Sequence, residues 1–368
     1  GVRGRSPRYK AMKQYANDRI AALSAYVPGE QPRDMKYIKL NTNESPFPPS
    51  PHVAERISGE EARLNLYPDP ACSELAAAAA AALGVGPENL IFTNGSDELL
   101  NFAFLAFCDA ERGIVFPDIT YGLYPVLCEM YGIPYRKIPV GADFGINPQD
   151  FFGIGQNVVI ANPNAPTGLV LSVSDIELIV RENPGRVVIV DEAYIAFGGE
   201  SCVGLIKKYD NLLVARTFSK SHSLAGARLG MGIGSAELIG YLNKVKYSFN
   251  PYSINRITLL AGLAAFEDEN YYIENCKEVI ATRERVKAEI RALGFTVTDS
   301  KANFLFAKSD RIGGRKLYDK LRQCGVLVRH FDVPGISDYN RITIGSKSQM
   351  EAFLDAVRNI INDREIIK

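Results

Sequence analysis

A lysine and an arginine lie eight residues apart in TFSKSHSLAGARLG, the segment from Thr217 to Gly230. The amine of Lys220 can form a Schiff base with a carbonyl group, and burial or a nearby cation lowers the pKa of such an amine enough to make it nucleophilic. A surface lysine in a serine-rich turn is the alternative explanation. Lys220 is therefore a candidate nucleophile.

A carboxylate follows the apolar run RVVIV, in the tetrapeptide DEAY at Asp191 to Tyr194. Burying an unpaired carboxylate costs free energy, so a cation is expected beside it. The protonated ring nitrogen of pyridoxal phosphate would be that cation, and a ring kept protonated acts as an electron sink. Asp191 thus indicates a pyridoxal-phosphate site, and an aspartate that caps a helix is the alternative explanation.

A phosphate group needs converging N–H donors and a cation, and TNGSDE at residues 93–98 offers the donors. The segment leads into a helical pattern, so the backbone amides of Ser96 and Asp97 would lie at a helix N-terminus, with the Asp97 side chain turned away to cap the helix. Ser219 and Arg228 would add a hydroxyl and a guanidinium. A turn that leads into a helix explains the segment when it is taken alone.

These residues need elements that bring them together. Six short apolar or β-branched runs alternate with helical patterns, as in an α/β sheet covered by helices. The runs are Leu90–Phe92, Gly113–Phe116, Asn157–Ala161, Val187–Val190, Leu212–Ala215 and Gly230–Ile233. Several are apolar throughout, which is typical of a mainly parallel sheet buried on both faces. Because ligands bind at the carboxyl ends of such strands, where the polar clusters fall, we predict one shared site.

The pattern changes near residue 252 to a long charged helical stretch at residues 267–293, an amphipathic helix near Gly314–Gln323, and paired strands that end in NRITIGS. This succession is typical of an α+β domain. We therefore predict a large cofactor-binding domain at residues 41–251 and a smaller substrate-side domain formed by residues 1–40 and 252–368.

Composition excludes several other classes of protein. The 42 Lys and Arg residues balance 42 Asp and Glu residues, so no excess positive charge favours nucleic acid. No apolar run approaches the ~20 residues of a membrane span. The six cysteines form no CxxC pair and the three histidines no HExxH motif. We expect a cytoplasmic protein with reduced thiols and no metal, and the basic residues 1–13 are expected to form a solvated tail.

Together, the motifs resemble those of fold-type I pyridoxal-phosphate aminotransferases, and most closely the histidinol-phosphate aminotransferase family. LSAYVPGE, LNTNESPFPPSP, NLYPDP, NGSDE, NPNAPTG, VDEAY, SKSHSLAGARLG and NRITIG occur in that family's order over nearly the whole chain. The resemblance implies an α/β fold with a large, mainly parallel sheet and a smaller α+β domain. It also implies pyridoxal 5′-phosphate as the cofactor and a homodimer with shared active sites.

The resemblance also implies roles for individual residues. Lys220 would bond covalently to the cofactor and move a proton, and Asp191 would pair with the ring nitrogen. Tyr194 would bond the 3′ oxygen of the cofactor, and Tyr121 would stack on its ring. Tyr67 in NLYPDP would reach the phosphate in the neighbouring subunit. The phosphate itself would be held by Ser96, Asp97, Ser219 and Arg228.

One position departs from the family pattern. Relatives usually carry two asparagines before PTG, and the second bonds the 3′ oxygen of the cofactor, whereas this chain has Ala165 there. Asn164 precedes it and is our candidate replacement. Without such a replacement, Tyr194 alone would bond the 3′ oxygen.

Four residues are expected to bind the substrate. Arg329 in LVRHFD and Arg341 in NRITIG are at positions similar to those where the family binds acid groups. The fork of an arginine suits a carboxylate or a phosphate, so one site can accept glutamate and histidinol phosphate in turn. Tyr26 resembles a further phosphate contact, and Asn43 lies in the substrate-side loop. Surface ion pairs are the alternative explanation for the two arginines.

The first functional hypothesis is transamination between L-histidinol phosphate and 2-oxoglutarate, in histidine biosynthesis. The alternatives are a threonine-phosphate decarboxylase-like lyase and an aromatic amino acid aminotransferase on the same scaffold. A non-catalytic regulator would need an attached DNA-binding module, for which the residues before Asn41 are too few. The small-molecule partners expected are an amino donor and a 2-oxo acid.

Overall fold

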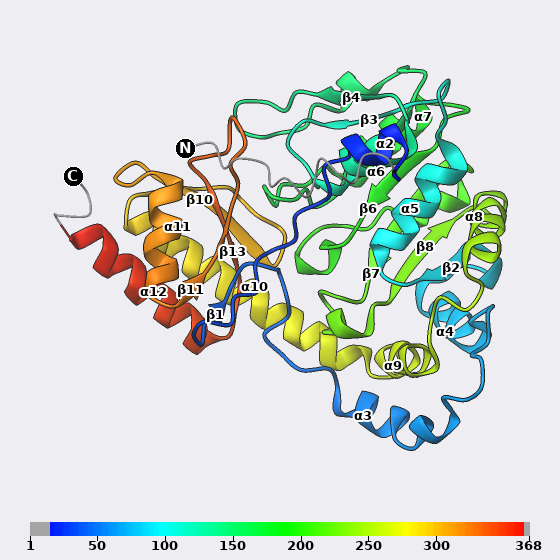
Figure 1. The fold of residues 1–368 in the computed structure, drawn as a ribbon, viewed down its shortest axis with the longest axis horizontal. Helices are drawn as coiled ribbons and strands as arrows, with labels where there is room; N and C mark the ends of the chain where they lie inside the picture. The colour runs from blue at the N-terminus through cyan, green and yellow to red at the C-terminus, as the bar shows by residue number, and fades with distance from the viewer. Residues whose placement is uncertain (1–14, 364–368) are drawn as a thin grey trace.

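The computed structural model of the chain describes residues 15–363 and contains two main β-sheets of unequal size (Figure 1). The basic segment at residues 1–13 lies outside the described residues. The larger sheet has seven strands and the smaller has four, and each is packed against its own helices. The fold class expected from the sequence, an α/β fold with a large sheet and a smaller α+β part, is confirmed.

The large sheet is mainly parallel. Its strands, in spatial order, are β2 (Leu90–Thr93), β8 (Gly230–Gly234), β7 (Leu212–Thr217), β6 (Val188–Asp191), β5 (Asn157–Ala161), β3 (Ile114–Pro117) and β4 (Tyr135–Ile138). Only β8 runs antiparallel to its neighbours. All six predicted strands are present. The sequence pattern does not reveal β4, because this edge strand reads YRKI and buries only its last residue.

Helices cover both faces of this sheet because alternate strand residues point to opposite sides. Val188 and Val190 belong to the core shared with α4 (Ser73–Leu83), α7 (Val173–Arg181) and α9 (Arg256–Glu267). Ile189 belongs to the opposite core, shared with α5 (Ser96–Phe107), α6 (Leu123–Tyr131) and α8 (Ala236–Phe249). Strands buried on both faces are mainly apolar, and the polar residues of these strands lie at their ends.

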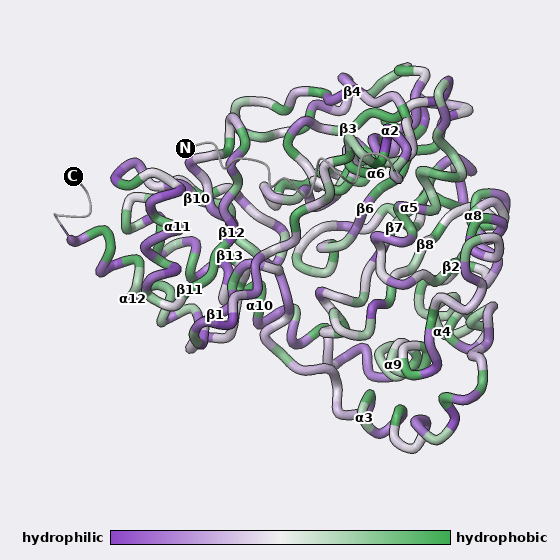
Figure 2. Tube along the Cα trace, in the orientation of Figure 1, coloured by the Kyte–Doolittle hydropathy of each residue, from purple (hydrophilic) through white to green (hydrophobic). Residues whose placement is uncertain are grey.

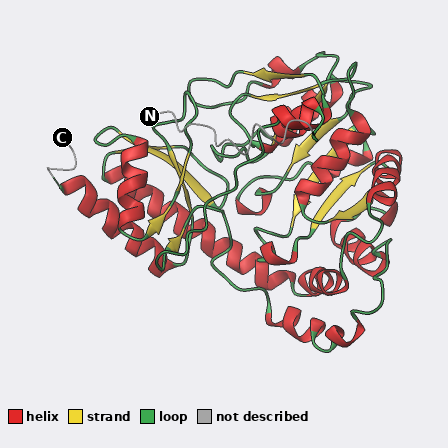
Figure 3. Ribbon diagram, in the orientation of Figure 1, coloured by secondary structure: helices red, strands yellow, loops and turns green. Residues whose placement is uncertain are grey.

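The small sheet is antiparallel, in the order β12 (Arg329–His330), β13 (Asn340–Thr343), β10 (Phe304–Ser309) and β9 (Phe295–Val297). One of its faces packs on α10 (Glu269–Ala292), α11 (Gly314–Gln323) and α12 (Lys347–Asn362). In Figure 2, α12 alternates between hydrophilic and hydrophobic colours, as an amphipathic helix does. Figure 3 shows these helices gathered on one side of the small sheet. The predicted helix at Gly314–Gln323 has the expected bounds.

The N-terminal residues contact both parts of the molecule. Strand β1 (Ile38–Lys39) pairs with β11 (Val326–Leu327) beside the small sheet, whereas α2 (Asp18–Ala22) contacts α6 beside the large sheet. Helix α9 packs against α3 (Pro51–Ile57) and α4, so a boundary at residue 252 would separate it from its neighbours. The division at residues 40/41 and 251/252 stays a prediction. No helix within residues 15–363 is both long and apolar enough to cross a bilayer.

Gly230 is needed where β8 meets the start of α5. A Cβ atom at this position would collide with backbone atoms of Gly95 and Ser96, which cannot move without shifting the helix start. We predict that Gly230→Ala lowers the free energy of unfolding by roughly 1–3 kcal/mol, the usual cost of overpacking. Urea unfolding of the cofactor-free protein measures this change.

Gly240→Ala is the matched control, because nothing lies within 4 Å of a Cβ atom there and the residue is in the interior of α8. It should leave stability unchanged or raise it by up to about 1 kcal/mol, since alanine favours helices. Equal stabilities for the two variants would contradict the close approach of β8 and α5.

Candidate active site

A cavity of about 730 Å³ lies at the carboxyl ends of β5, β6 and β7, facing the small sheet. Ala161, Asp191 and Thr217, the last residues of these strands, all line it. Of the predicted site residues, those that line the cavity are Tyr26, Asn43, Ser96, Asp97, Tyr121, Asp191, Tyr194, Ser219, Lys220, Arg228, Arg329 and Arg341. The edge at which ligands bind in open α/β sheets therefore carries these side chains.

Lys220 lies three residues beyond the end of β7, half-buried in the cavity wall. Its Nζ donates a hydrogen bond to the carbonyl oxygen of Thr42, 3.0 Å away. Burial lowers the pKa of this amine to about 8, and the charge of Arg341 contributes to the shift. No carboxylate in the described part of the chain lies within ion-pair distance of it. Roughly a tenth of the amine is therefore deprotonated at pH 7, far more than for an ordinary lysine, and this fraction can attack a carbonyl carbon.

Asp191 is the last residue of β6 and its side chain is buried, with the residue only 5% exposed. The hydroxyl of Tyr124 donates to Oδ2 at 3.1 Å, and the backbone N–H of Ala193 donates to Oδ1 at 3.1 Å. No Lys, Arg or His among residues 15–363 forms an ion pair with this carboxylate, and burial raises its pKa to about 6. A protonated pyridine nitrogen would supply the cation that this buried carboxylate lacks.

Tyr124 is a site residue that the sequence motifs do not reveal. It lies in α6, three residues after Tyr121, and is fully buried. The rings of the two tyrosines meet edge to face with centroids 5.6 Å apart. The sequence offers only the nearness of Tyr124 to Tyr121, because Tyr121 precedes the helix and no helical spacing relates the two.

The first turn of α5 forms a cradle for an anion. Gly95 precedes the helix with φ +82°, and a Cβ atom there would collide with the Arg228 guanidinium. Nη1 of Arg228 donates to Oγ of Ser219 at 3.4 Å. The amides of Ser96 and Asp97 belong to this first turn, so N–H groups, a hydroxyl and a guanidinium converge, as a phosphate requires.

The Asp97 side chain does not cap α5 as we expected from the sequence. Its Oδ1 accepts a hydrogen bond from Tyr121 at 3.0 Å, and its Oδ2 lies 3.7 Å from Nη2 of Arg228. Glu98 instead holds the turn before the helix, because its Oε2 accepts from the backbone N–H of Asn94 at 2.6 Å. Asp97 therefore orients a ring and a guanidinium that both line the cavity.

The phenol of Tyr194 accepts a hydrogen bond from Nδ2 of Asn43, with a distance of 2.9 Å. Burial raises the pKa of this phenol, so it keeps its proton at neutral pH. Its own hydrogen goes to no acceptor among the residues that the structure describes. The phenol can therefore donate to a ligand oxygen in the cavity while Asn43 fixes its position.

Arg329 and Arg341 lie directly opposite each other on the antiparallel strands β12 and β13. Like charges at opposite positions destabilise a sheet, and neither arginine has a carboxylate partner within the described ranges. Arg341 donates through Nη2 to the carbonyl oxygen of Asn41 at 3.1 Å, and its buried Nε has no partner. Two unneutralised guanidiniums at one cavity wall indicate a site for an acid group.

Two predicted site residues do not line the cavity. The amide of Asn164 donates to the carbonyl oxygen of Ile119 at 2.9 Å and to Oγ1 of Thr167 at 3.1 Å. Both of its N–H groups are thus used within the chain, and it holds the loop before Tyr121 instead of facing the cavity. Tyr67 is 78% exposed and its ring stacks on Tyr252 with centroids 4.4 Å apart. A residue that serves a neighbouring subunit must be exposed on its own.

The residues present fit pyridoxal phosphate. The buried Asp191 carboxylate lacks a cation, the first turn of α5 converges with Arg228 on one point, and the Lys220 amine lies in the same cavity. Such a group, when bound, supplies a carbonyl carbon for amino groups and an electron sink for the bonds at the substrate carbon. No cluster of potential metal ligands occurs in the described residues. Fold and site together define a pyridoxal-phosphate enzyme of fold-type I.

Comparison with known proteins specifies the family. The family model for aminotransferase class I and II matches residues 35–357. A curated histidinol-phosphate aminotransferase of Brachyspira hyodysenteriae is 45% identical over 354 residues, which is 96% of this chain and 100% of that protein. The chain therefore belongs to the aminotransferase class I and II family and, within it, to the histidinol-phosphate aminotransferases. The expected aminotransferase activity and pyridoxal-phosphate cofactor are confirmed by this membership.

Solved structures agree on the fold. The histidinol-phosphate aminotransferase of Sinorhizobium meliloti, solved with pyridoxal-5′-phosphate, matches with a TM-score of 0.82 at 24% identity, over 88% of this chain and 90% of that one. The L-threonine-O-3-phosphate decarboxylase of Porphyromonas gingivalis matches with a TM-score of 0.76 at 20% identity, over 88% and 99% of the two chains. The fold is thus shared by a transaminase and a lyase and does not distinguish them.

The buried carboxylate generates a pH-dependent prediction for the cofactor-free protein. The pKa of Asp191 rises from 3.8 to about 6 on folding. Its ionisation therefore destabilises the folded state above pH 6 by about 3 kcal/mol, and this cost disappears as the pH falls from 6 to 4. Asp191→Asn should raise the free energy of unfolding at pH 8 by up to that amount and lose the advantage near pH 4. Urea unfolding across this pH range measures the difference.

Asp310→Asn, at an exposed position, should keep the wild-type pH dependence. If the free energy of unfolding changed with pH in the same way for wild type and Asp191→Asn, the carboxylate would ionise freely in the folded protein. The same Asp191 variant should weaken activity strongly once the cofactor is added, because the partner of the ring nitrogen is lost.

Proposed function

We propose that this chain transfers the amino group of L-histidinol phosphate to 2-oxoglutarate, giving imidazole acetol phosphate and L-glutamate in histidine biosynthesis. The observation that carries the proposal is the pair of opposed arginines, Arg329 and Arg341, at the wall of the cofactor cavity. A guanidinium fork binds a phosphate or a carboxylate equally well, so one wall serves both substrates in turn. The name of the 45% identical relative supports the same substrate.

The chain's own residues divide the work of the reaction. Lys220, the only lysine proposed to act chemically, would remove and return the proton at the substrate carbon, for which its lowered pKa suits it. Asp191 would keep the ring nitrogen protonated, and Tyr194 would donate its hydrogen to the 3′ oxygen. Tyr121 would lie against the ring face, held by its bond to Asp97.

Two alternative activities use the same cofactor residues. A decarboxylase of threonine phosphate would also bind a phosphorylated amine, and the Porphyromonas gingivalis enzyme shares this fold. An aromatic amino acid aminotransferase would bind the carboxylate of its donor at the same wall. Which bond breaks depends on how the substrate is held against the ring, so a substrate test decides between them.

A homodimer with shared active sites is part of the proposal. Leu64, Leu66 and Tyr67 are exposed apolar side chains close in sequence, and Tyr67 stacks on the exposed Tyr252. Apolar groups of this size usually face a partner, and a two-fold interface would place Tyr67 of each subunit toward the other. We also propose a cytoplasmic location, which agrees with the six free cysteines.

The first test is an absorbance measurement. Purified protein with pyridoxal phosphate should show a visible band, and L-histidinol phosphate added without a keto acid should convert it to the band of the aminated cofactor near the ultraviolet. Lys220→Ala should abolish the conversion and turnover, whereas Lys316→Ala, an exposed lysine on α11, should behave as wild type.

A visible band that does not change would keep the cofactor and reject histidinol phosphate as the amino donor. Release of carbon dioxide from threonine phosphate would then favour the lyase. Near-normal turnover by Lys220→Ala would reject the assignment of this lysine.

The shared site generates a second prediction. Tyr67→Ala and Lys220→Ala should each be inactive alone, because each damages both sites of a dimer. When the two proteins are mixed and allowed to exchange subunits, half of the dimers carry one intact site, so roughly a quarter of the wild-type activity should appear. Mixing two Lys220→Ala preparations is the control. A mixture that stays inactive after verified exchange would show that Tyr67 does not serve the partner's site.

A further inference from the structure

A buried arginine on the long helix α10 joins two segments that lead into the active site. The side chain of Arg283 is only 2% exposed. Its Nη1 donates to two backbone carbonyl oxygens, that of Phe197 at 2.7 Å and that of Ala302 at 2.9 Å. Phe197 ends the turn η5 (Ile195–Phe197) after β6, and Ala302 precedes β10 of the small sheet. One nitrogen thus connects the large-sheet side to the small-sheet side.

These contacts belong to a closed path of bonds around the phenol of Tyr194. The backbone N–H of Phe197 donates to the carbonyl oxygen of Tyr194 at 3.1 Å. On the other side, Asn303 follows Ala302, and its Nδ2 donates to the carbonyl oxygen of Asn43 at 3.0 Å. Nδ2 of Asn43 in turn bonds the Tyr194 hydroxyl at 2.9 Å. Arg283 therefore lies opposite the phenol in the same path.

Packing reinforces this path. Ala302 and Phe304 form a small buried cluster with Ala165 and the ring of Tyr194, and the Phe304 ring meets the Tyr194 ring edge to face at 5.1 Å. A shift of the segment before β10 would move both the aromatic contact and the Asn303 bond. The position of the phenol thus depends on where this segment is held.

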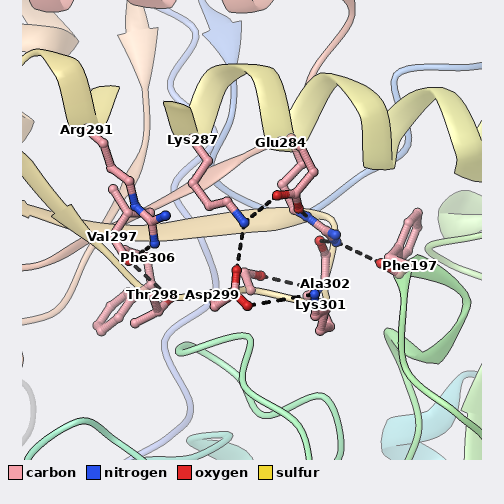
Figure 4. Close-up of polar contacts among 12 residues, drawn as sticks. Phe197, Glu284, Lys287, Arg291, Val297, Thr298, Asp299, Lys301, Ala302 and Phe306 are labelled. Atoms are coloured by element: carbon pink, nitrogen blue, oxygen red, sulfur yellow. Dashed lines mark hydrogen bonds and ion pairs between the residues drawn. The ribbon is translucent and has the colours of Figure 1, made fainter. Parts of the chain in front are cut away.

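Two other basic residues of α10 bond residues further from Tyr194, at the end of β9 and two residues beyond it, and neither reaches the large-sheet side. Lys287 donates to Oδ1 of Asp299 at 2.7 Å, and Nη2 of Arg291 donates to the carbonyl oxygen of Val297 at 2.8 Å. Figure 4 shows Lys287 and Arg291 reaching from the helix to this segment, and Phe197 on a separate ribbon beyond Ala302. The spacing of four residues puts Arg283, Lys287 and Arg291 on one face of the helix. Of the three, Arg283 alone contacts Phe197.

The charge of Arg283 is costly to bury. Its only carboxylate contact within residues 15–363 is Glu284, which lies 2.9 Å from Nε and is 42% exposed. An apolar side chain of similar size is often tolerated where a buried ion is replaced, so the fold itself does not require a guanidinium here. The feature that an apolar side chain cannot reproduce is the bond from one nitrogen to two carbonyl groups.

We propose that Arg283 is a positioning residue that fixes the Tyr194 phenol against the cofactor by joining the turn after Tyr194 to the segment before β10. This inference rests on the proposed role of Tyr194 toward the 3′ oxygen of the cofactor. Arg283 touches neither substrate nor cofactor, since it does not line the cavity. It acts through the backbone of Phe197 and Ala302.

The test follows the pH at which the visible absorbance of the bound cofactor changes. A hydrogen bond from Tyr194 to the 3′ oxygen favours the deprotonated chromophore, so losing it moves the midpoint to higher pH. Tyr194→Phe should produce the full shift. Arg283→Met in the full-length holoenzyme should move the midpoint in the same direction by at least about 0.5 pH unit and lower kcat roughly tenfold, with KM changed less. Arg283→Lys, which keeps a donor, should lie between Arg283→Met and wild type.

Arg291→Met is the matched control, because it removes a bond from the same helix to Val297, the last residue of β9, and leaves both bonds of Arg283 in place. It should leave the midpoint and kcat unchanged. The double variant Arg283→Lys with Tyr194→Phe should show the same midpoint as Tyr194→Phe alone, because residues that act through one another are not additive. Thermal unfolding of each variant without cofactor shows that it is folded.

The possible failures are distinguishable. A wild-type protein with no visible band would reject the proposed cofactor chemistry, and a Tyr194→Phe variant with an unshifted midpoint would reject the role of that phenol. If Tyr194→Phe shifts the midpoint while folded Arg283→Met and Arg283→Lys do not, the positioning role is overturned. Additive shifts in the double variant would also overturn it, as would an equal shift in Arg291→Met.

Discussion

The active site depends on a carboxylate that the protein buries without a cation. Asp191 ends a strand that is covered by helices on both faces, so it is 5% exposed, and among the described residues only Tyr124 and one backbone amide bond it. The resulting pKa of about 6 measures how poorly the folded chain alone satisfies this charge. A cofactor with a protonated ring nitrogen would lower the free-energy cost of burying this carboxylate. The site therefore favours a ligand that carries a cation at this point.

The same principle extends across the cavity. The cradle at the start of α5 gathers N–H groups and Arg228 around a point where Asp97, in a looser contact, is the one anionic group among residues 15–363. Arg329 and Arg341 oppose each other at the facing wall without carboxylate partners in the described residues. Each of these two arginines is held in place by bonds to backbone carbonyls, which fix its direction but leave its charge unneutralised. The chain thus supplies charges whose partners would come from the cofactor and the substrate.

These groups can act together only if the two sheets keep a fixed position relative to each other. The segment between β9 and β10 contacts the loop after Asn164 through the bond from the Lys301 N–H to the carbonyl oxygen of Gly168, at 2.7 Å, and through the Thr298 hydroxyl, which donates to the carbonyl oxygen of Thr167 at 2.7 Å. Helix α10 anchors that segment through its row of basic residues (Figure 4). Residues proposed to bind the cofactor and residues proposed to bind the substrate are therefore positioned against one another by contacts outside the cavity.

The six core strands and the polar cluster after each can be predicted from the order of the residues, because apolar periodicity and strand-end chemistry are local properties. Since the ends of neighbouring strands meet at one edge, the motifs alone also assign Lys220, Asp191 and Arg228 to one site. Three other features arise only when the chain folds: Asn164 faces away from the cavity, Tyr124 bonds Asp191, and Arg283 joins two distant carbonyls. Backbone carbonyls occur at every residue and leave no signature in a sequence, so contacts to them are decided by packing.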